Sequence, residues 1–181
     1  MNDFFRLYGT KLWNAIGIHL VYVLVSVSIG FIIALALGIL LSRLPRISRY
    51  VLPIISVVQT IPGIVFIGIL FLYTGMVPAT VFIALTIYAI FPVLKNTYTG
   101  LIGVSQEYKE AAKGCGMSSL QSLFWVELPL ALPEIIGGLR MSTVYTVSWA
   151  VLASMIGLGG LGDFVYIGVS TNNNTDRKSV V

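Results

Sequence analysis

The amino-acid sequence predicts an all-α integral membrane protein. Of its 181 residues, 57% are hydrophobic and 10% are charged, whereas a soluble domain is about one quarter charged. The apolar residues gather in four long stretches, and the longest polar segment, residues 107–116, lies between the third and the fourth. Because roughly 20 helical residues cross a bilayer core of about 30 Å, four membrane spans are expected. One histidine and one cysteine predict neither a metal site nor an internal disulfide.

The first apolar stretch is expected to span the membrane over residues 18–41. Residues 1–17 are polar to amphipathic and are expected to lie at the extracytoplasmic surface. Within the span, Gly30, Ala34 and Gly38 recur every fourth residue, so another helix can approach closely. His19 begins the span, and an interfacial side chain is favoured there over a buried proton carrier.

The second apolar stretch, residues 50–73, carries a helix breaker near its middle. Pro62 cannot donate the backbone hydrogen bond that a continuous helix needs, and Gly63 loosens the helix further. Gln59 and Thr60 place polar side chains at the same depth, where lipid cannot satisfy them. The pattern predicts a kink, which either lines a translocation pathway or is a structural kink with Gln59 bonded to a neighbouring helix.

The third and fourth spans are predicted over residues 78–94 and 141–156. Lys95 closes the third, and Arg140 marks the start of the fourth, which is rich in hydroxyl groups. Those hydroxyls either face the pathway or bond back to their own helix. The candidate pathway residues of the second and fourth spans are Gln59, Thr60, Pro62, Tyr145, Ser148 and Trp149.

Four glycines within residues 157–162 predict a turn at the outer membrane surface. A phosphate-binding loop would need a lysine after the glycines, and Asp163 and Phe164 follow instead.

The polar segment after the third span predicts two short helices joined by a hinge. Ser105 can cap the first helix, in which Glu110 is close enough to pair with Lys113. Gly114 and Gly116 are expected to end it, because glycine accepts the left-handed conformation of a sharp turn. Ser118 and Gln121 form a capping box that starts the second helix, and Pro129 and Pro133 are expected to stop it. Such a pair of helices suits the groove of a partner protein.

The distribution of basic residues predicts the topology. With alternating spans, one side receives seven of them: Arg43, Arg46, Arg49, Lys95, Lys109, Lys113 and Arg140. The other side receives Arg6 and Lys11, apart from the tail. Since loops rich in lysine and arginine stay in the cytoplasm, the N-terminus is predicted outside and the polar segment inside.

The spacing in that segment resembles the EAA loop of ABC-importer permeases. The pattern is Glu-Ala-Ala, three residues, Gly, nine residues, an aliphatic residue, one residue, then Leu-Pro; Val126 stands where isoleucine is usual. Residues 59–63 and 157–164 resemble the osmoprotectant branch, which handles glycine betaine, carnitine and choline. Together the similarity covers roughly residues 15–175. The residues that fall on the loop's pattern are Glu110, Ala111, Ala112, Gly116, Leu128 and Pro129.

The resemblance implies a type I (MetI-like) transmembrane domain and a subunit that is not itself an enzyme. The importer would join two permeases (identical or sister chains), two cytoplasmic ATPases that use ATP, and an extracellular binding protein, separate or fused. The six loop residues would contact the ATPase. The chain would bind no cofactor, no metal and no nucleic acid, and would lie in a bacterial or archaeal cytoplasmic membrane.

The resemblance also divides the chain. Residues 18–170 would form the transmembrane domain, with a cytoplasmic coupling loop over residues 95–139. A further C-terminal span of the resembling permeases is expected to be missing, and residues 171–181 are expected to be a truncated tail of artificial origin.

Other functions remain open at this stage. The permease could import another small solute, such as an amino acid or related amine. A secondary transporter or channel is less favoured, because no ionisable residue is predicted deep in a span. A membrane enzyme would need clustered acids or bases, and His19, Glu134 and Asp163 are too scattered.

Overall fold

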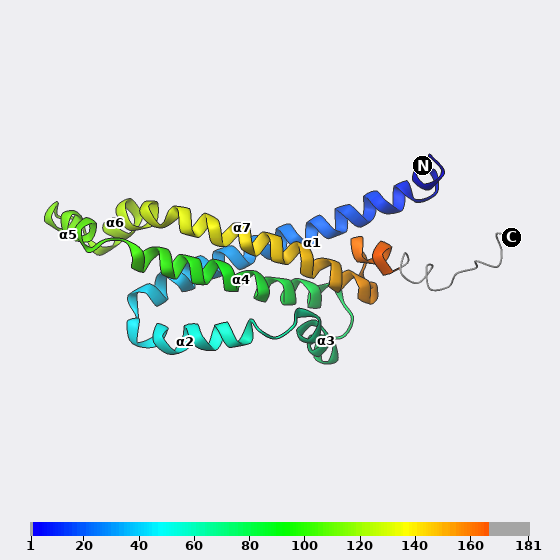
Figure 1. Cartoon of the computed structure of the whole chain (residues 1–181), viewed down its shortest axis with the longest axis horizontal. Helices are drawn as coiled ribbons and strands as arrows, with labels where there is room; N and C mark the ends of the chain where they lie inside the picture. The colour runs from blue at the N-terminus through cyan, green and yellow to red at the C-terminus, as the bar shows by residue number, and fades with distance from the viewer. Residues whose placement is uncertain (1, 167–181) are drawn as a thin grey trace.

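The computed structural model describes residues 2–166, and these residues form helices and turns without a strand. Helices α1, α4 and α7 run side by side, and α5 and α6 lie at the end of this bundle opposite the N-terminus (Figure 1). The elements in order are α1 (Asn2–Arg43), α2 (Pro45–Val58), α3 (Gly63–Thr74), α4 (Pro78–Gly103), α5 (Gln106–Gly114), α6 (Ser119–Ser122), the π-helical η1 (Leu123–Glu127), α7 (Leu128–Ala153) and the π-helical η2 (Ser154–Leu158). The expected tail, residues 171–181, lies outside the described residues.

Helix α1 is longer than the predicted first span and has no break near residue 17. It packs parallel to α4 through its small residues. A Cβ atom built on Gly30 would lie 2.8 Å from the Cβ of Ala89, and one built on Gly38 would lie 2.7 Å from the Cβ of Thr97. The spacing of small residues therefore correctly predicted a close helix contact, and α4 is the partner.

The second predicted span is broken rather than kinked. Helices α2 and α3 meet at 91°, and α3 begins at Gly63 with Pro62 as its N-cap residue. The break therefore falls at the predicted residues, but the change of direction is far larger than a proline kink within one helix. Three helices of the described chain are long and apolar enough to cross a membrane, and the bent pair α2–α3 makes a fourth if it counts as one span.

Helices α4 and α7 continue past the predicted ends of their spans. Lys95 lies within α4, and Arg140 lies within α7. The two helices are antiparallel, because Gly138 packs on Asn96 while Gly100 packs on Ala131. The predicted coupling loop, residues 95–139, is thus mostly helical, and the non-helical links within it are short.

The register among the helices locates the segment that fits the bilayer. Residue 38 of α1 lies beside Thr97, near the level of Lys95 and Arg140. At the other end, Gly159 contacts Ile18, and the Tyr22 hydroxyl donates to the Leu158 carbonyl oxygen (3.1 Å). Twenty residues of α1 between these levels span about 30 Å, the thickness of the hydrocarbon core. We infer that the last two turns of α4 and the first three of α7 project beyond it.

The predicted glycine-rich turn is confirmed. Gly157, Gly159 and Gly160 have φ angles of 94°, 78° and 117°, which L-residues with side chains rarely adopt. Gly157 interrupts η2 from within, and the backbone N–H of Gly162 donates to the Ser154 hydroxyl (2.6 Å).

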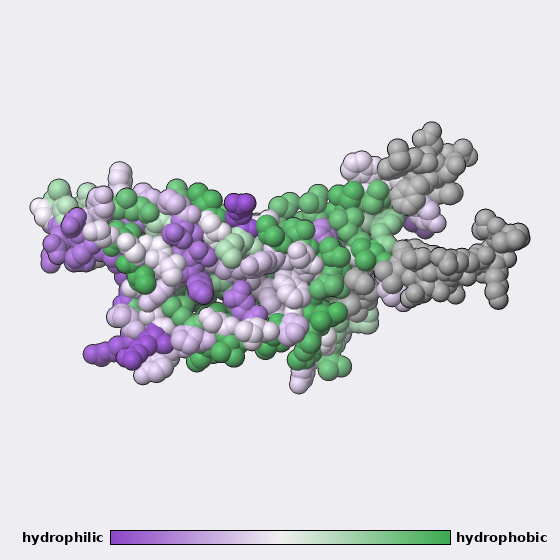
Figure 2. Space-filling model, viewed as in Figure 1, coloured by the Kyte–Doolittle hydropathy of each residue, from purple (hydrophilic) through white to green (hydrophobic). Residues whose placement is uncertain are grey.

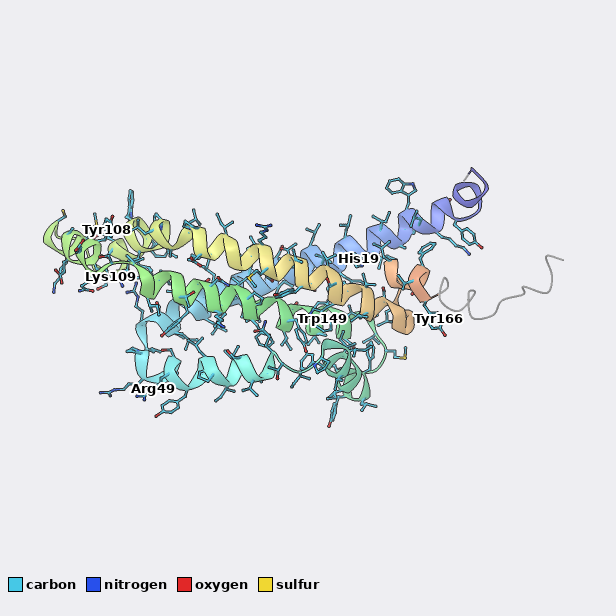
Figure 3. All side chains as sticks on the ribbon, viewed as in Figure 1. His19, Arg49, Tyr108, Lys109, Trp149 and Tyr166 are labelled. Carbon is cyan, nitrogen blue, oxygen red and sulfur yellow. The ribbon has the colours of Figure 1, made fainter. Side chains whose placement is uncertain are left out.

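The surface of the molecule is polarised along the bundle. Figure 2 shows hydrophilic residues gathered at the end that carries α5 and at the start of α2, where Figure 3 labels Arg49. The surface of α3 and the neighbouring bundle is mainly hydrophobic (Figure 2). Of the basic residues that were used to predict the topology, Arg43, Arg46 and Arg49 flank the link from α1 to α2, and Lys109 and Lys113 lie in α5.

Replacing Gly30 with alanine is expected to lower the thermal stability of the purified chain, although alanine favours helix more than glycine does. The added methyl group would meet Ala89 and, at 3.1 Å, the carbonyl oxygen of Thr86, so α1 and α4 must separate; overpacking of this kind costs about 1–3 kcal/mol. Gly17 is the matched control, because its Cβ would meet nothing within 4 Å. Thermal unfolding in detergent should separate the two variants, and equal stability would contradict the close packing.

Candidate functional site

The first candidate site is the segment around α5. Ser105 caps α5, and its hydroxyl accepts from the backbone N–H of Glu107 (3.3 Å). Glu110 and Ala111 are exposed, whereas Ala112 is buried against the rest of the segment. The predicted pairing of Glu110 with Lys113 is wrong, because no ion pair joins these two side chains in the described part of the chain; the Glu110 carboxylate accepts instead from the Gln106 side-chain amide (3.3 Å). The helix thus presents two acidic side chains, Glu107 and Glu110, and the small side chain of Ala111 to the surroundings.

The turn after α5 has the predicted left-handed glycine. Gly116 has φ +79°, and a Cβ at this position would meet nothing within 4 Å. The turn is closed by two backbone bonds, from Gly116 N–H to the Lys113 carbonyl oxygen (3.0 Å) and from Met117 N–H to that of Ala112 (3.1 Å). Such bonds satisfy carbonyl groups at the end of a helix, so the position needs glycine for its backbone angle and not for space.

The second helix of the segment starts as predicted and ends differently. Ser118 N–H donates to the Gln121 side chain (2.8 Å), and Gln121 N–H donates to the Ser118 hydroxyl (3.3 Å), which confirms the capping box. Pro129 and Pro133 do not stop the helix: α6, η1 and α7 follow one another without a gap. Pro129 lies just after the π-helical turn, inside this continuous run, so it omits one backbone bond. Pro133 omits one internal bond, which a packed membrane helix tolerates.

The six residues of the loop pattern therefore lie on two helices, α5 and α7, and on the turn that follows α5. Glu110, Ala111 and Ala112 belong to α5, and Gly116 makes the turn. Leu128 packs against a buried cluster that includes Leu123 and Ile135, and Pro129 is exposed. Figure 3 labels Tyr108 and Lys109 in the same region at the far end of the bundle.

The second candidate site is a cavity of about 370 Å³ beside the break between α2 and α3. Four of the six predicted pathway residues line it, together with two that the sequence did not single out. Its lining consists of Ser56, Gln59, Thr60, Tyr88, Tyr145 and Trp149. This size and mixture of aromatic and polar groups are typical of a small-molecule pocket.

The other two predicted pathway residues do not line this cavity. Pro62 lies at the break itself, as the N-cap of α3. The Ser148 hydroxyl donates back to the Val144 carbonyl oxygen of its own helix (3.1 Å). Thr143 and Thr146 bond back to α7 in the same way, so for these three hydroxyls the alternative prediction is correct.

Two aromatic residues hold the break in place. The Tyr88 hydroxyl of α4 donates to the Ile61 carbonyl oxygen (2.8 Å), a group that the interrupted helix leaves without a regular partner. The indole ring of Trp149 lies directly on Gly63, because a Cβ there would come within 2.3 Å of its ring. Tyr88 and Trp149 also pack on each other, with ring centroids 5.3 Å apart. Figure 3 labels Trp149 on α7 near α3.

Tyr88 is a residue that sequence reasoning missed. It is one of several aromatic residues in the third span, and no local signal distinguishes it. Only the fold places its hydroxyl beside the carbonyl of Ile61.

The chain is similar to known transport proteins over most of its length. Residues 15–180 match the model of the family "Binding-protein-dependent transport system inner membrane component". The glycine betaine/carnitine/choline transport system permease protein OpuCB of Bacillus subtilis is 41% identical over 94% of this chain and 78% of its own length. The choline transport system permease protein OpuBB of the same organism is 42% identical over 84% of this chain and 70% of its own.

A solved structure shares the fold. An inward-facing conformation of the MetNI methionine ABC transporter gives a TM-score of 0.77 at 23% identity, over 86% of this chain and 79% of that chain. These matches favour the permease over the secondary transporter or channel considered as an alternative. The chain belongs to the family of binding-protein-dependent transport system inner membrane components, and is a multi-pass protein of the cytoplasmic membrane.

Proposed function

We propose that this chain is the permease subunit of an ATP-driven importer that moves a small osmoprotectant such as glycine betaine, carnitine or choline. The names of relatives at about 40% identity support this substrate class. A separate cytoplasmic ATPase supplies the energy, a second permease (the same or a sister chain) completes the pathway, and an extracellular binding protein delivers the solute. The N-terminus lies outside and α5 inside, as the clustering of basic residues supports.

One observation carries the coupling role: a capped helix and a glycine turn stand at the end of the bundle that projects beyond the inferred bilayer. Glu110 offers a charge to the ATPase, Ala111 permits close approach, and Gly116 sets the angle between α5 and α6. Because α6, η1 and α7 are continuous, displacement of α5 tilts α7 directly. From Ser119 to Trp149 this lever is about 45 Å long.

The cavity at the α2–α3 break lies on the route of the solute in this proposal. Its polar groups, Gln59 and Thr60, are exposed within it, and Tyr145 and Trp149 offer aromatic faces. Aromatic faces attract quaternary ammonium groups by cation–π interaction. Movement of α7 would shift both rings relative to α3 and so change access to the cavity.

Reconstitution tests the proposal. The chain, produced together with an ATPase subunit and a binding protein of an osmoprotectant importer, is expected to co-purify with the ATPase and to take up labelled glycine betaine, carnitine or choline in proteoliposomes when ATP is enclosed. Uptake of an amino acid instead would assign the other solute class. Uptake without ATP, or the absence of a bound ATPase, would contradict the coupling.

A further inference from the structure

An ion pair joins the end of α1 to the start of α7. The Arg43 guanidinium donates to a Glu127 carboxylate oxygen at 2.8 Å, and this is the salt bridge found within residues 2–166. The Ser122 hydroxyl donates to the other carboxylate oxygen (3.3 Å). The Glu127 side chain is only 4% exposed, whereas that of Arg43 is 43% exposed. The carboxylate is therefore shielded from water between two helices, and the Arg43 guanidinium is its counter-charge.

The local backbone explains how a charged side chain reaches this place. Glu127 is the last residue of the π-helical η1, whose wider turn rotates the side chains relative to a regular α-helix. It stands between Val126 and Leu128 of the loop pattern. Arg43 is the last residue of α1. The pair therefore connects the coupling segment, by which we mean α5, the turn at Gly116, α6 and η1, to the end of a different membrane helix.

Stability alone does not account for such a pair. Burying a carboxylate is costly, and replacing a buried ion pair with well-packed apolar residues of similar volume often leaves the stability of the folded protein unchanged or raises it. What a directional pair adds is a fixed position of one helix end relative to the other. Phe31, Leu35 and Ile39 of α1 pack against the buried cluster that contains Leu123, but such apolar contacts allow sliding that a bond between charged groups resists.

We propose that Arg43 and Glu127 form a rigid link through which displacement of the coupling segment reaches α1, so that α1 and α7 move together when the ATPase closes. Both are positioning residues, because neither lines the cavity at the α2–α3 break. The inference rests on the proposed coupling of α5 to an ATPase and is independent of which solute is carried.

A distance measurement tests the link directly. With Cys115 replaced by serine, one cysteine in place of the exposed Leu120 of α6 and another in place of the exposed Leu37 of α1 allow two spin labels in one chain, diluted with unlabelled chain so that pairs within one permease dominate. Position 120 follows the turn at Gly116, so in the assembled transporter the distance distribution between positions 37 and 120 is expected to stay unchanged between the nucleotide-free state and the state trapped with an ATP analogue. With Glu127→Gln the distribution should shift or broaden on trapping. A nucleotide-dependent shift in the chain without that substitution would overturn the link, as would a Glu127→Gln distribution that stays fixed.

Paired substitutions separate transmission from folding. Glu127→Gln is expected to lower uptake per ATP hydrolysed about tenfold, within the usual range of coupling energies, and the exchange Arg43→Glu with Glu127→Arg should restore part of it. Arg43→Met with Glu127→Leu should keep thermal stability but not coupling; normal coupling in that apolar pair would reduce the ion pair to a structural role.

Arg46→Gln is the matched control, since Arg46 is exposed and forms no ion pair within residues 2–166. Absence of uptake by the unsubstituted transporter would count against the proposed function, whereas the label distances would still decide the link.

Discussion

Substitution of Gly63 by alanine is expected to lower solute uptake by the assembled transporter about tenfold and to reduce its thermal stability. A Cβ at this position would lie 2.3–2.7 Å from three carbon atoms of the Trp149 indole. A rigid ring cannot bend out of the way as a flexible side chain would, so α3 or the ring itself must move. Overpacking in a closely packed region costs about 1–3 kcal/mol, and here the displaced ring also lines the cavity.

Gly68 provides the control for this prediction. It lies in the same helix, and its Cβ would meet nothing within 4 Å, so Gly68→Ala should transport normally. Adding Trp149→Leu to Gly63→Ala should relieve the clash and restore stability without restoring uptake, because the aromatic wall is then missing. Uptake measured in proteoliposomes and unfolding followed by fluorescence check both parts. If Gly63→Ala transports as well as Gly68→Ala, the seating of Trp149 on α3 has no role in the transport cycle.

Local signals predicted the ends of helices correctly where only neighbouring residues decide them. The cap at Ser105 and the box formed by Ser118 and Gln121 depend on side chains within three residues of the backbone groups that they satisfy. The positive φ of Gly116 likewise follows from the demands of a tight turn. Such features require no knowledge of the rest of the fold, and the sequence was sufficient for them.

The same reasoning failed where packing between helices overrides local preference. Pro129 and Pro133 were expected to end a helix, yet the π-helical turn before them and the contacts of α7 with α4 carry the helix through. Pro62 was expected to bend a helix, and it instead separates α2 from α3 at 91°. The size of that change depends on Tyr88 and Trp149, which lie on other helices.

The continuity of α6, η1 and α7 changes how force would reach the membrane. If the prolines had ended the second helix, a flexible link would have separated the coupling segment from the fourth span. Because they do not, the turn at Gly116 is the main adjustable angle between the surface of α5 and the lever of α7. The transmission of movement from α5 to α7 therefore depends mainly on the backbone conformation of Gly116.

Replacing Gly116 with valine is accordingly expected to uncouple ATP hydrolysis from uptake while leaving membrane insertion intact. A side chain in the left-handed region costs about 1–2 kcal/mol, and a β-branched residue is a greater outlier there. The chain would relieve this strain by leaving φ +79°, which breaks the bond from Met117 N–H to the Ala112 carbonyl oxygen. Helix α5 would then meet the ATPase at the wrong angle, so that ATP is hydrolysed with about tenfold less solute moved.

A graded series makes this test specific to the backbone angle. Because a Cβ at Gly116 meets nothing within 4 Å, steric contact cannot explain a defect, and asparagine, which tolerates the left-handed region, should be milder than alanine and alanine milder than valine. Gly114, two residues earlier, lies in α5 with open space around it and no positive φ. Gly114→Ala should therefore transport normally, since alanine favours helix over glycine by up to about 1 kcal/mol. Uptake per ATP that is equal in all four variants would show that the angle of this turn does not govern coupling.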